Sequence, residues 1–147
     1  MSETPNTGRK PDPQIIARSI QTSSDLLRAI DQTEQQFQRL PVFIRPMAKS
    51  YFKDSAGQST EDWRDTINEL MNKLEAIGHD DNTARQWLNA SYPRLREMLQ
   101  KLSTVFGNAP QQVAMMTSDQ ETLKTAKLSA AEYQGIIERL LGLLDLV

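Results

Sequence analysis

Residues 59–78, STEDWRDTINELMNKLEAIG, decide the fold class of this chain because they carry a complete helix signal. Ser59, followed three residues later by Asp62, approximates a capping box, in which the first side chain accepts a hydrogen bond from a backbone N–H of the first turn. Gly78 suits the end of a helix. Between these signals, apolar side chains recur at helical spacing and form one stripe: Trp63, Ile67, Leu70, Met71, Leu74 and Ile77.

The segments before this stretch show the same period. A first helix is predicted from Pro13 to Leu40, because the residue before Pro41 is pushed out of the helical region. Its apolar seam consists of Ile16, Ile20, Leu27, Ile30 and Phe37. Residues 41–57 predict a short helix, with Pro46 suited to its first turn and Gly57 to the position just past its end.

The segments after Gly78 also predict helices. An Asp or Asn within residues 79–83 is expected to cap a helix whose stripe is Ala84, Trp87, Leu88, Leu95, Met98, Leu99, Leu102 and Phe106. Pro93 either kinks this helix or separates two helices, and residues 107–110 are expected to close it. Residues 111–127 give a weak helix signal. Ser129 and Glu132 form a capping box that predicts the start of the last helix.

These patterns predict an all-α fold, since no segment alternates long enough to indicate a strand. We expect a single-domain helical bundle of five to six helices over residues 14–147. Residues 1–13 contain three prolines, one glycine and no large apolar residue except Met1, so they predict a flexible N-terminal tail.

Composition excludes several classes of function. The 147 residues contain no cysteine and one histidine, His79, which removes thiolate metal sites, iron–sulfur clusters and most histidine metal sites. The same lone histidine leaves no Ser-His-acid arrangement, so we expect no enzyme, no metal and no cofactor. A net charge of -2 argues against a nucleic-acid partner. No apolar run is long enough for a membrane span, and no targeting signal is present, so we expect a cytoplasmic protein.

The last stretch, IIERLLGLLDLV at residues 136–147, is the first candidate binding surface. Its apolar arc is wider than one helix contact needs. The arc is either packed among other helices or partly exposed to a partner, which includes a second copy of the chain. The residues assigned to partner binding here are Leu140, Leu143, Leu144, Leu146 and Val147.

A second candidate surface is the row of Arg45, Lys49 and Lys53 on the short helix. Residues four apart share one helical face, so these charges would meet an acidic partner together or form a solvated face. A different function is suggested by Trp63, Trp87 and Tyr92, which would line an apolar pocket for a ligand or pigment if they are not core residues.

Residues 38–56, QRLPVFIRPMAKSYFKDSA, contain Pro41, Phe43, Ile44, Arg45 and Lys49 in an order that resembles a small helical module. That module occurs at the C-terminus of the B subunit of light-independent protochlorophyllide reductase. The resemblance covers residues 35–75 and implies a helical accessory role, because the iron–sulfur and catalytic residues of that family have no counterpart here. Our first hypothesis is therefore a non-enzymatic helical module that binds a protein partner as an adaptor, assembly factor or regulator.

Overall fold

The computed structural model describes residues 11–116 and 118–147, apart from the side chain of Met116. These residues form five helices and no strand, which confirms the all-α prediction: α1 (Pro13–Arg39), α2 (Arg45–Ala56), α3 (Thr60–Gly78), α4 (Asn82–Met116) and α5 (Gln120–Leu144). Residues 1–10 of the predicted tail lie outside the described residues. α1 begins at Pro13, where the first helix was predicted to begin.

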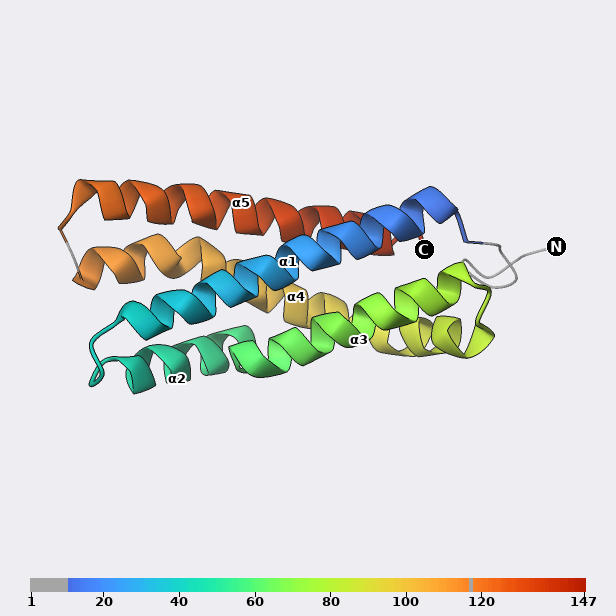
Figure 1. The fold of residues 1–147 in the computed structure, drawn as a ribbon, viewed down its shortest axis with the longest axis horizontal. Coiled ribbons are helices and arrows are strands. Elements are labelled where there is room, and N and C mark those ends of the chain that lie inside the picture. Colours follow the sequence, from blue (N-terminus) through green and yellow to red (C-terminus); the bar gives the residue numbers. More distant parts are fainter. Residues whose placement is uncertain (1–10, 117) are drawn as a thin grey trace.

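The helices form an elongated antiparallel bundle (Figure 1). α2 and α3 run in the same direction along one side, so together they form one broken rod beside α1, α4 and α5. α1 packs against α3 and α5, α4 packs against α5, and α2 packs mainly against α4. The corner between α1 and α2 and the connection between α4 and α5 lie at one end of the bundle, and the turn between α3 and α4 lies at the other (Figure 1).

Side-chain caps fix where most helices begin. The carboxylates of Asp12, Asp81 and Asp119 accept backbone N–H groups of the first turns of α1, α4 and α5, and the Ser59 hydroxyl accepts the N–H of Asp62 at 3.1 Å. These contacts satisfy donors that the helix itself leaves free. Gly57 ends α2 with φ of 87°, a conformation that costs glycine little.

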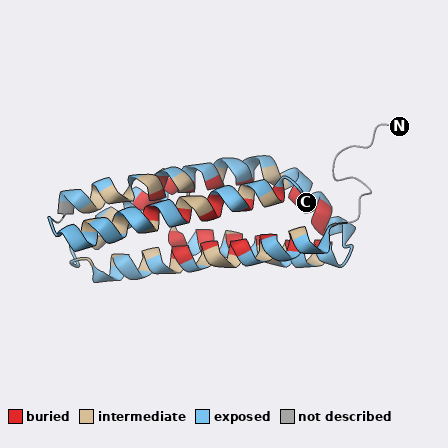
Figure 2. Ribbon diagram, turned by 90° about the horizontal axis from the view of Figure 1, so that it is seen from above, coloured by how far each residue is buried: buried red, intermediate tan, exposed pale blue. Residues whose placement is uncertain are grey.

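The core lies along the bundle axis, where the buried sides of the helices face one another (Figure 2). The stripe of residues 59–78 is buried except for Met71, which is half-buried, and the Trp63 indole N–H donates to the carbonyl of Ala56 at 3.1 Å. The largest fully buried side chains from the other helices are Leu26, Ile30, Leu99, Leu102, Ile137 and Leu140.

α4 is one continuous helix, so Pro93 does not separate two helices. The expected closure at residues 107–110 is wrong for the same reason: the helix runs through Gly107 and Pro110 to Met116. A proline inside a helix costs about 3 kcal/mol, which burial of the α4 stripe offsets. Phe106 is buried edge-to-face against Tyr133 of α5 at 5.0 Å, and this contact holds the segment around Gly107 against α5.

The last helix begins ten residues earlier than predicted, since its cap is Asp119 and not Ser129. Asp119 caps α5 at Gln120, and Ser129 with Glu132 lies inside the helix. The Asp119 carboxylate accepts both the Glu121 N–H at 3.3 Å and the Thr122 hydroxyl at 2.7 Å. This cap was missed because the first turns of α5 carry few apolar residues and therefore show no clear periodicity. Residues 111–116 thus belong to the end of α4 and residues 120–127 to the start of α5.

Candidate functional site

Exposed apolar side chains gather at the corner between α1 and α2. Val42, Phe43, Met47 and Tyr51 are 74, 78, 72 and 41% exposed. We call these four residues the corner patch. The other large apolar residues found exposed in the described part of the chain are Met115, Leu128 and Leu146, which are separated from one another in the sequence. The corner patch is therefore a local concentration of apolar surface.

The corner is held in place by backbone hydrogen bonds. The Pro41 carbonyl accepts the N–H groups of Ile44 at 2.9 Å and Arg45 at 3.2 Å, which closes a tight turn directly before α2. The Leu40 N–H bonds to the Phe37 carbonyl and ends α1. Val42 and Phe43 are thus presented on a turn with its own hydrogen bonds rather than on a long loop.

The helical period explains why the corner patch faces outward. Phe52 and Ala56 of α2 are buried, and the Phe52 ring meets Phe37 of α1 edge-to-face at 5.9 Å. Met47 and Tyr51 are four residues apart, so they share a different side of α2, and Phe43 lies on the turn just before this helix. The buried side anchors the helix, and the apolar row is left to solvent.

Arg45 serves the fold rather than an exposed binding surface. Its guanidinium donates to the backbone carbonyls of Leu40 at 2.9 Å and Gln38 at 2.6 Å. These carbonyls belong to the end of α1, where no further helical N–H is available to them. This contact turns Arg45 back onto α1 and separates it from the rest of the predicted basic row, whose role in partner binding stays a prediction.

Lys49 and Lys53 differ in their surroundings. The Lys49 ammonium lies 3.3 Å from the Glu34 carboxylate, which also accepts the Thr60 hydroxyl at 2.5 Å. Burial alone would raise the pKa of Glu34, but the hydrogen bonds from Thr60 and Lys49 outweigh it and the pKa is lowered. This cluster joins α1, α2 and the start of α3. Lys53 is exposed on the last turn of α2.

The structure corrects part of the prediction of a C-terminal binding surface. Leu140, Leu144 and Val147 are buried in the core of the same chain, because α5 packs against both α1 and α4. They cannot meet a partner without opening the bundle. Leu143 is half-buried and Leu146 is 60% exposed, so these two residues are what remains of the predicted C-terminal surface.

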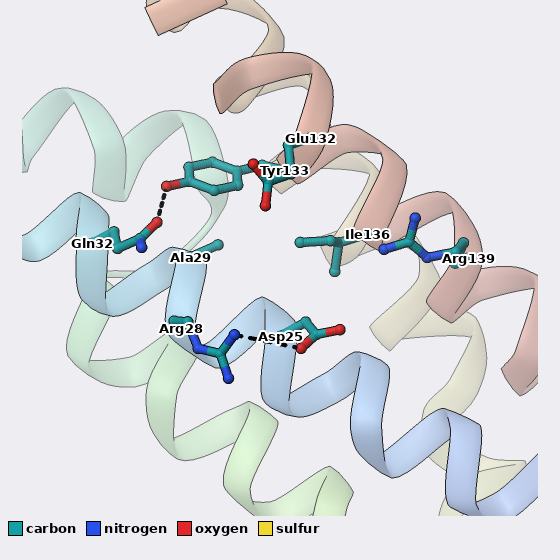
Figure 3. Close-up of a pocket in the computed structure, with 8 residues that line it drawn as sticks. All are labelled: Asp25, Arg28, Ala29, Gln32, Glu132, Tyr133, Ile136 and Arg139. Carbon is teal, nitrogen blue, oxygen red and sulfur yellow. Dashed lines mark hydrogen bonds and ion pairs between the residues drawn. The ribbon is translucent and has the colours of Figure 1, made fainter. Parts of the chain in front are cut away.

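A polar groove of about 270 Å³ runs between α1 and α5 (Figure 3). The Tyr133 hydroxyl bonds the Gln32 side chain across it, and Arg28 pairs with Asp25 at 3.9 Å on one wall. Burial first, and then the charge of Glu132, raises the pKa of Tyr133. The lining residues are Asp25, Arg28, Ala29, Gln32, Glu132, Tyr133, Ile136 and Arg139. Among the described residues, no three His, Cys, Asp or Glu side chains are grouped to hold a metal ion.

The three aromatic residues of the ligand hypothesis have separate surroundings. Trp63 is fully buried, Trp87 is half-buried beneath the Lys73 ammonium at 5.6 Å, and the Tyr92 hydroxyl donates toward Asp145 and the Leu141 carbonyl. None of them lines the groove between α1 and α5, or a smaller groove of about 130 Å³ beside Phe37 and Phe52. Trp63 is a core residue.

Sequence reasoning missed the corner patch, although a signal was present. Phe43, Met47 and Tyr51 recur every four residues alongside Ile44, Ala48 and Phe52, so two apolar rows occupy one short helix. A helix on the outside of a bundle buries one such row. The second row was the indication of an exposed apolar surface.

No protein-family model matches the chain, and neither a curated protein nor a solved structure matches it significantly. The resemblance of residues 35–75 to the reductase module therefore stays a prediction. None of the helices in the described part of the chain is long and apolar enough to cross a membrane.

Proposed function

We propose that this chain is a non-enzymatic, cytoplasmic helical bundle that binds another protein, as an adaptor, assembly factor or regulator, through the corner patch. The observation that supports the proposal is the group of exposed apolar side chains at one fixed corner. Contiguous apolar surface of this kind commonly marks a site of protein contact.

The chemistry of the corner patch suits an interface core. Phenylalanine, tyrosine and methionine are enriched at the centres of protein interfaces, where they are removed from water. The turn at Pro41 and the clamp from Arg45 hold the patch before any partner arrives. Binding would then lose little conformational entropy, because the apolar side chains already stand on an ordered backbone.

A photo-crosslinking amino acid at position 47 of the full chain tests this proposal in extracts of the source cells. We expect a discrete adduct with one other protein. The matched control places the same amino acid at Leu128, which is also apolar and exposed but lies on α5. Phe43→Asp in the chain that carries the label at position 47 should remove the adduct while the far-ultraviolet circular dichroism stays unchanged.

The same experiment separates the alternatives. An adduct of twice the chain mass would show that the partner is a second copy of this chain and not another protein. Equal labelling from positions 47 and 128, or no adduct from position 47, would contradict the assignment of the corner patch as a binding surface.

A further inference from the structure

Burial stops at the same level on the two helices that α4 and α5 bring to their connection. Val105 and Phe106 are the last buried residues described on α4, and Ala130 is the first on α5. Beyond this level, none of the side chains described in residues 107–116 and 120–129 is buried. We call these two ranges the arm. The arm is helical, yet it contributes no buried side chain to the core.

The opposite end of the bundle is packed as far as its turn. Ile77 and Ala84, on either side of the turn between α3 and α4, are 1 and 2% exposed. In the arm, Val113 and Leu123 are half-buried and Leu128 is 64% exposed. Burial of apolar surface is the main favourable contribution to folding, so the arm is held less firmly than the opposite end.

The backbone of α4 is also weakened where the arm begins. Pro110 has no N–H, so the helix cannot supply a donor to the Phe106 carbonyl, and Gly107 lowers the helix propensity of the same turn. Pro93 interrupts α4 in the same way, but Leu95 and other buried side chains follow it. None of the α4 side chains described after Pro110 is buried. Packing therefore offsets the break at Pro93 more fully than the break at Pro110.

Two contacts hold α4 against α5 directly before the arm. The Phe106 ring meets Tyr133 edge-to-face at 5.0 Å, and the Gln134 side-chain amide donates to the Ser103 carbonyl at 3.0 Å. Gly107 makes room for this amide, because a Cβ added at Gly107 would overlap the Gln134 Nε2. We call these two contacts the latch. The latch thus lies between the buried core and the arm.

We propose that the arm unfolds locally as one cooperative unit while the latch and the core behind it stay folded. The two segments of the arm lose their helical structure together, because α4 packs chiefly against α5 and neither segment has a described side chain that is buried. The chain then has two states that share one core. They differ at the end of the bundle that also carries the corner between α1 and α2 (Figure 1). The arm contains no residue of the corner patch, so this local unfolding is independent of the proposed function.

Native-state hydrogen exchange of the full chain, followed by NMR, tests the proposal. The amides of residues 112–115 and 124–128 have helical acceptors four residues before them, so their exchange reports opening of the helix. We expect their protection factors to agree within about tenfold and to be at least about a hundredfold lower than those of residues 99–102 and 137–141. Protection of the arm equal to that of the core would overturn the proposal, and a larger difference between the two segments would overturn the single unit.

Two matched proline variants locate the boundary of the unit. Pro110→Ala supplies an N–H for the Phe106 carbonyl and should raise the protection of the arm at least about tenfold. Pro93→Ala makes the same change in the core part of α4 and should leave the protection of the arm unchanged. An arm that exchanges at the same rate in wild type and Pro110→Ala would contradict a boundary at this proline.

A variant of Gln134 tests the latch. Gln134→Ala removes the hydrogen bond to Ser103 and should extend the fast exchange to residues 103–106, while residues 137–141 keep their protection. Glu138→Ala replaces an exposed residue one turn further along α5 and should change neither range. Fast exchange that stays confined to the arm in Gln134→Ala would show that the latch does not set the boundary.

Limited proteolysis gives an independent measurement of the same unit. Lys101, Lys124 and Lys127 are all exposed on helices, and the last two lie in the arm. A protease needs a locally unfolded segment, so trypsin should cut after Lys124 or Lys127 at least about tenfold faster than after Lys101. The fragments should stay associated, because the buried Tyr133 and Ile137 follow the cut. Cleavage after Lys101 at an equal rate would count against a separate arm.

Discussion

The Arg45 guanidinium donates a hydrogen bond of 2.9 Å to the backbone carbonyl of Leu40, the residue that ends α1. A second bond of 2.6 Å reaches the carbonyl of Gln38. The first residue of α2 thus caps the helix before it. This clamp holds the corner together with the turn at Pro41 and the contact between Phe37 and Phe52.

Replacing Arg45 should therefore destabilise the bundle. We expect Arg45→Ala to lower the free energy of unfolding by about 1–2 kcal/mol, because it removes hydrogen bonds from a charged donor and leaves helix-end carbonyls to water. Lys53→Ala is the control on the same helix and should stay within about 0.5 kcal/mol of wild type. Urea unfolding followed by circular dichroism measures both, and equal losses would contradict the clamp.

The C-terminal leucines should divide into two groups. Leu140→Ala should lower the free energy of unfolding by about 2–5 kcal/mol, because the fully buried side chain leaves a cavity. Leu146→Asp should change it by about 0.5 kcal/mol or less, since that side chain is 60% exposed. Thermal unfolding of the two variants checks the division. A large loss for Leu146→Asp would show that the end of the chain is more tightly packed than the structure indicates.

Replacing Ser23 with alanine should stabilise the fold. Its hydroxyl is buried and has no hydrogen-bond partner, whereas the neighbouring buried Ser19 donates to the Ile15 carbonyl at 2.7 Å. An unsatisfied buried polar group costs about 1–3 kcal/mol, and alanine also favours the helix. We expect Ser23→Ala to raise the free energy of unfolding by about 1 kcal/mol. Ser19→Ala should not raise it, and a similar gain from both variants would attribute the effect to helix propensity alone.

Tyr92 should make the fold sensitive to alkali. Burial first, and then the hydrogen bond to Asp145, raises the pKa of Tyr92 from 10.0 to about 12. The folded state keeps this proton while the unfolded state loses it, so the contribution is present below pH 10 and is lost as the pH rises toward 12.

Urea unfolding across this alkaline range, together with a spectroscopic titration of tyrosinate, measures the effect of Tyr92. Tyr92→Phe should reduce the fall in stability over the window. Tyr133→Phe is the comparison, because the pKa of Tyr133 is also raised. A wild-type titration in which every tyrosine ionises near pH 10 would contradict the prediction for Tyr92.

The fold was predictable where apolar periodicity and caps agree. Residues 59–78 met both conditions, and α3 starts after Ser59 and ends at Gly78 as predicted. The end of α4 was not predictable, because Gly107 and Pro110 are local stop signals that a tertiary contact, Phe106 against Tyr133, overrides. Local propensity gives way to burial when the two disagree.

The candidate surfaces were harder to predict because the sequence gives the apolar arc of a helix but not how many neighbours cover it. α5 contacts both α1 and α4, which bury Leu140 and Leu144. α2 packs mainly against α4 and buries only Phe52 and Ala56. The fate of Arg45 depended on the angle between α1 and α2, which no spacing in the sequence reports. The charge pattern did not report the hydrogen bonds that turn Arg45 back onto α1.

The length of α1 sets the distance between the start of this helix and the corner between α1 and α2. α1 has 27 residues, and at about 1.5 Å per residue its start stands roughly 40 Å from the corner between α1 and α2. The start of α1 and the corner therefore lie at opposite ends of the bundle (Figure 1). A chain tethered to a sensor surface by a label ahead of Pro13 would hold its corner outward into solution, and a fluorophore pair placed at the two ends of α1 would report bending of this helix as a change in energy transfer.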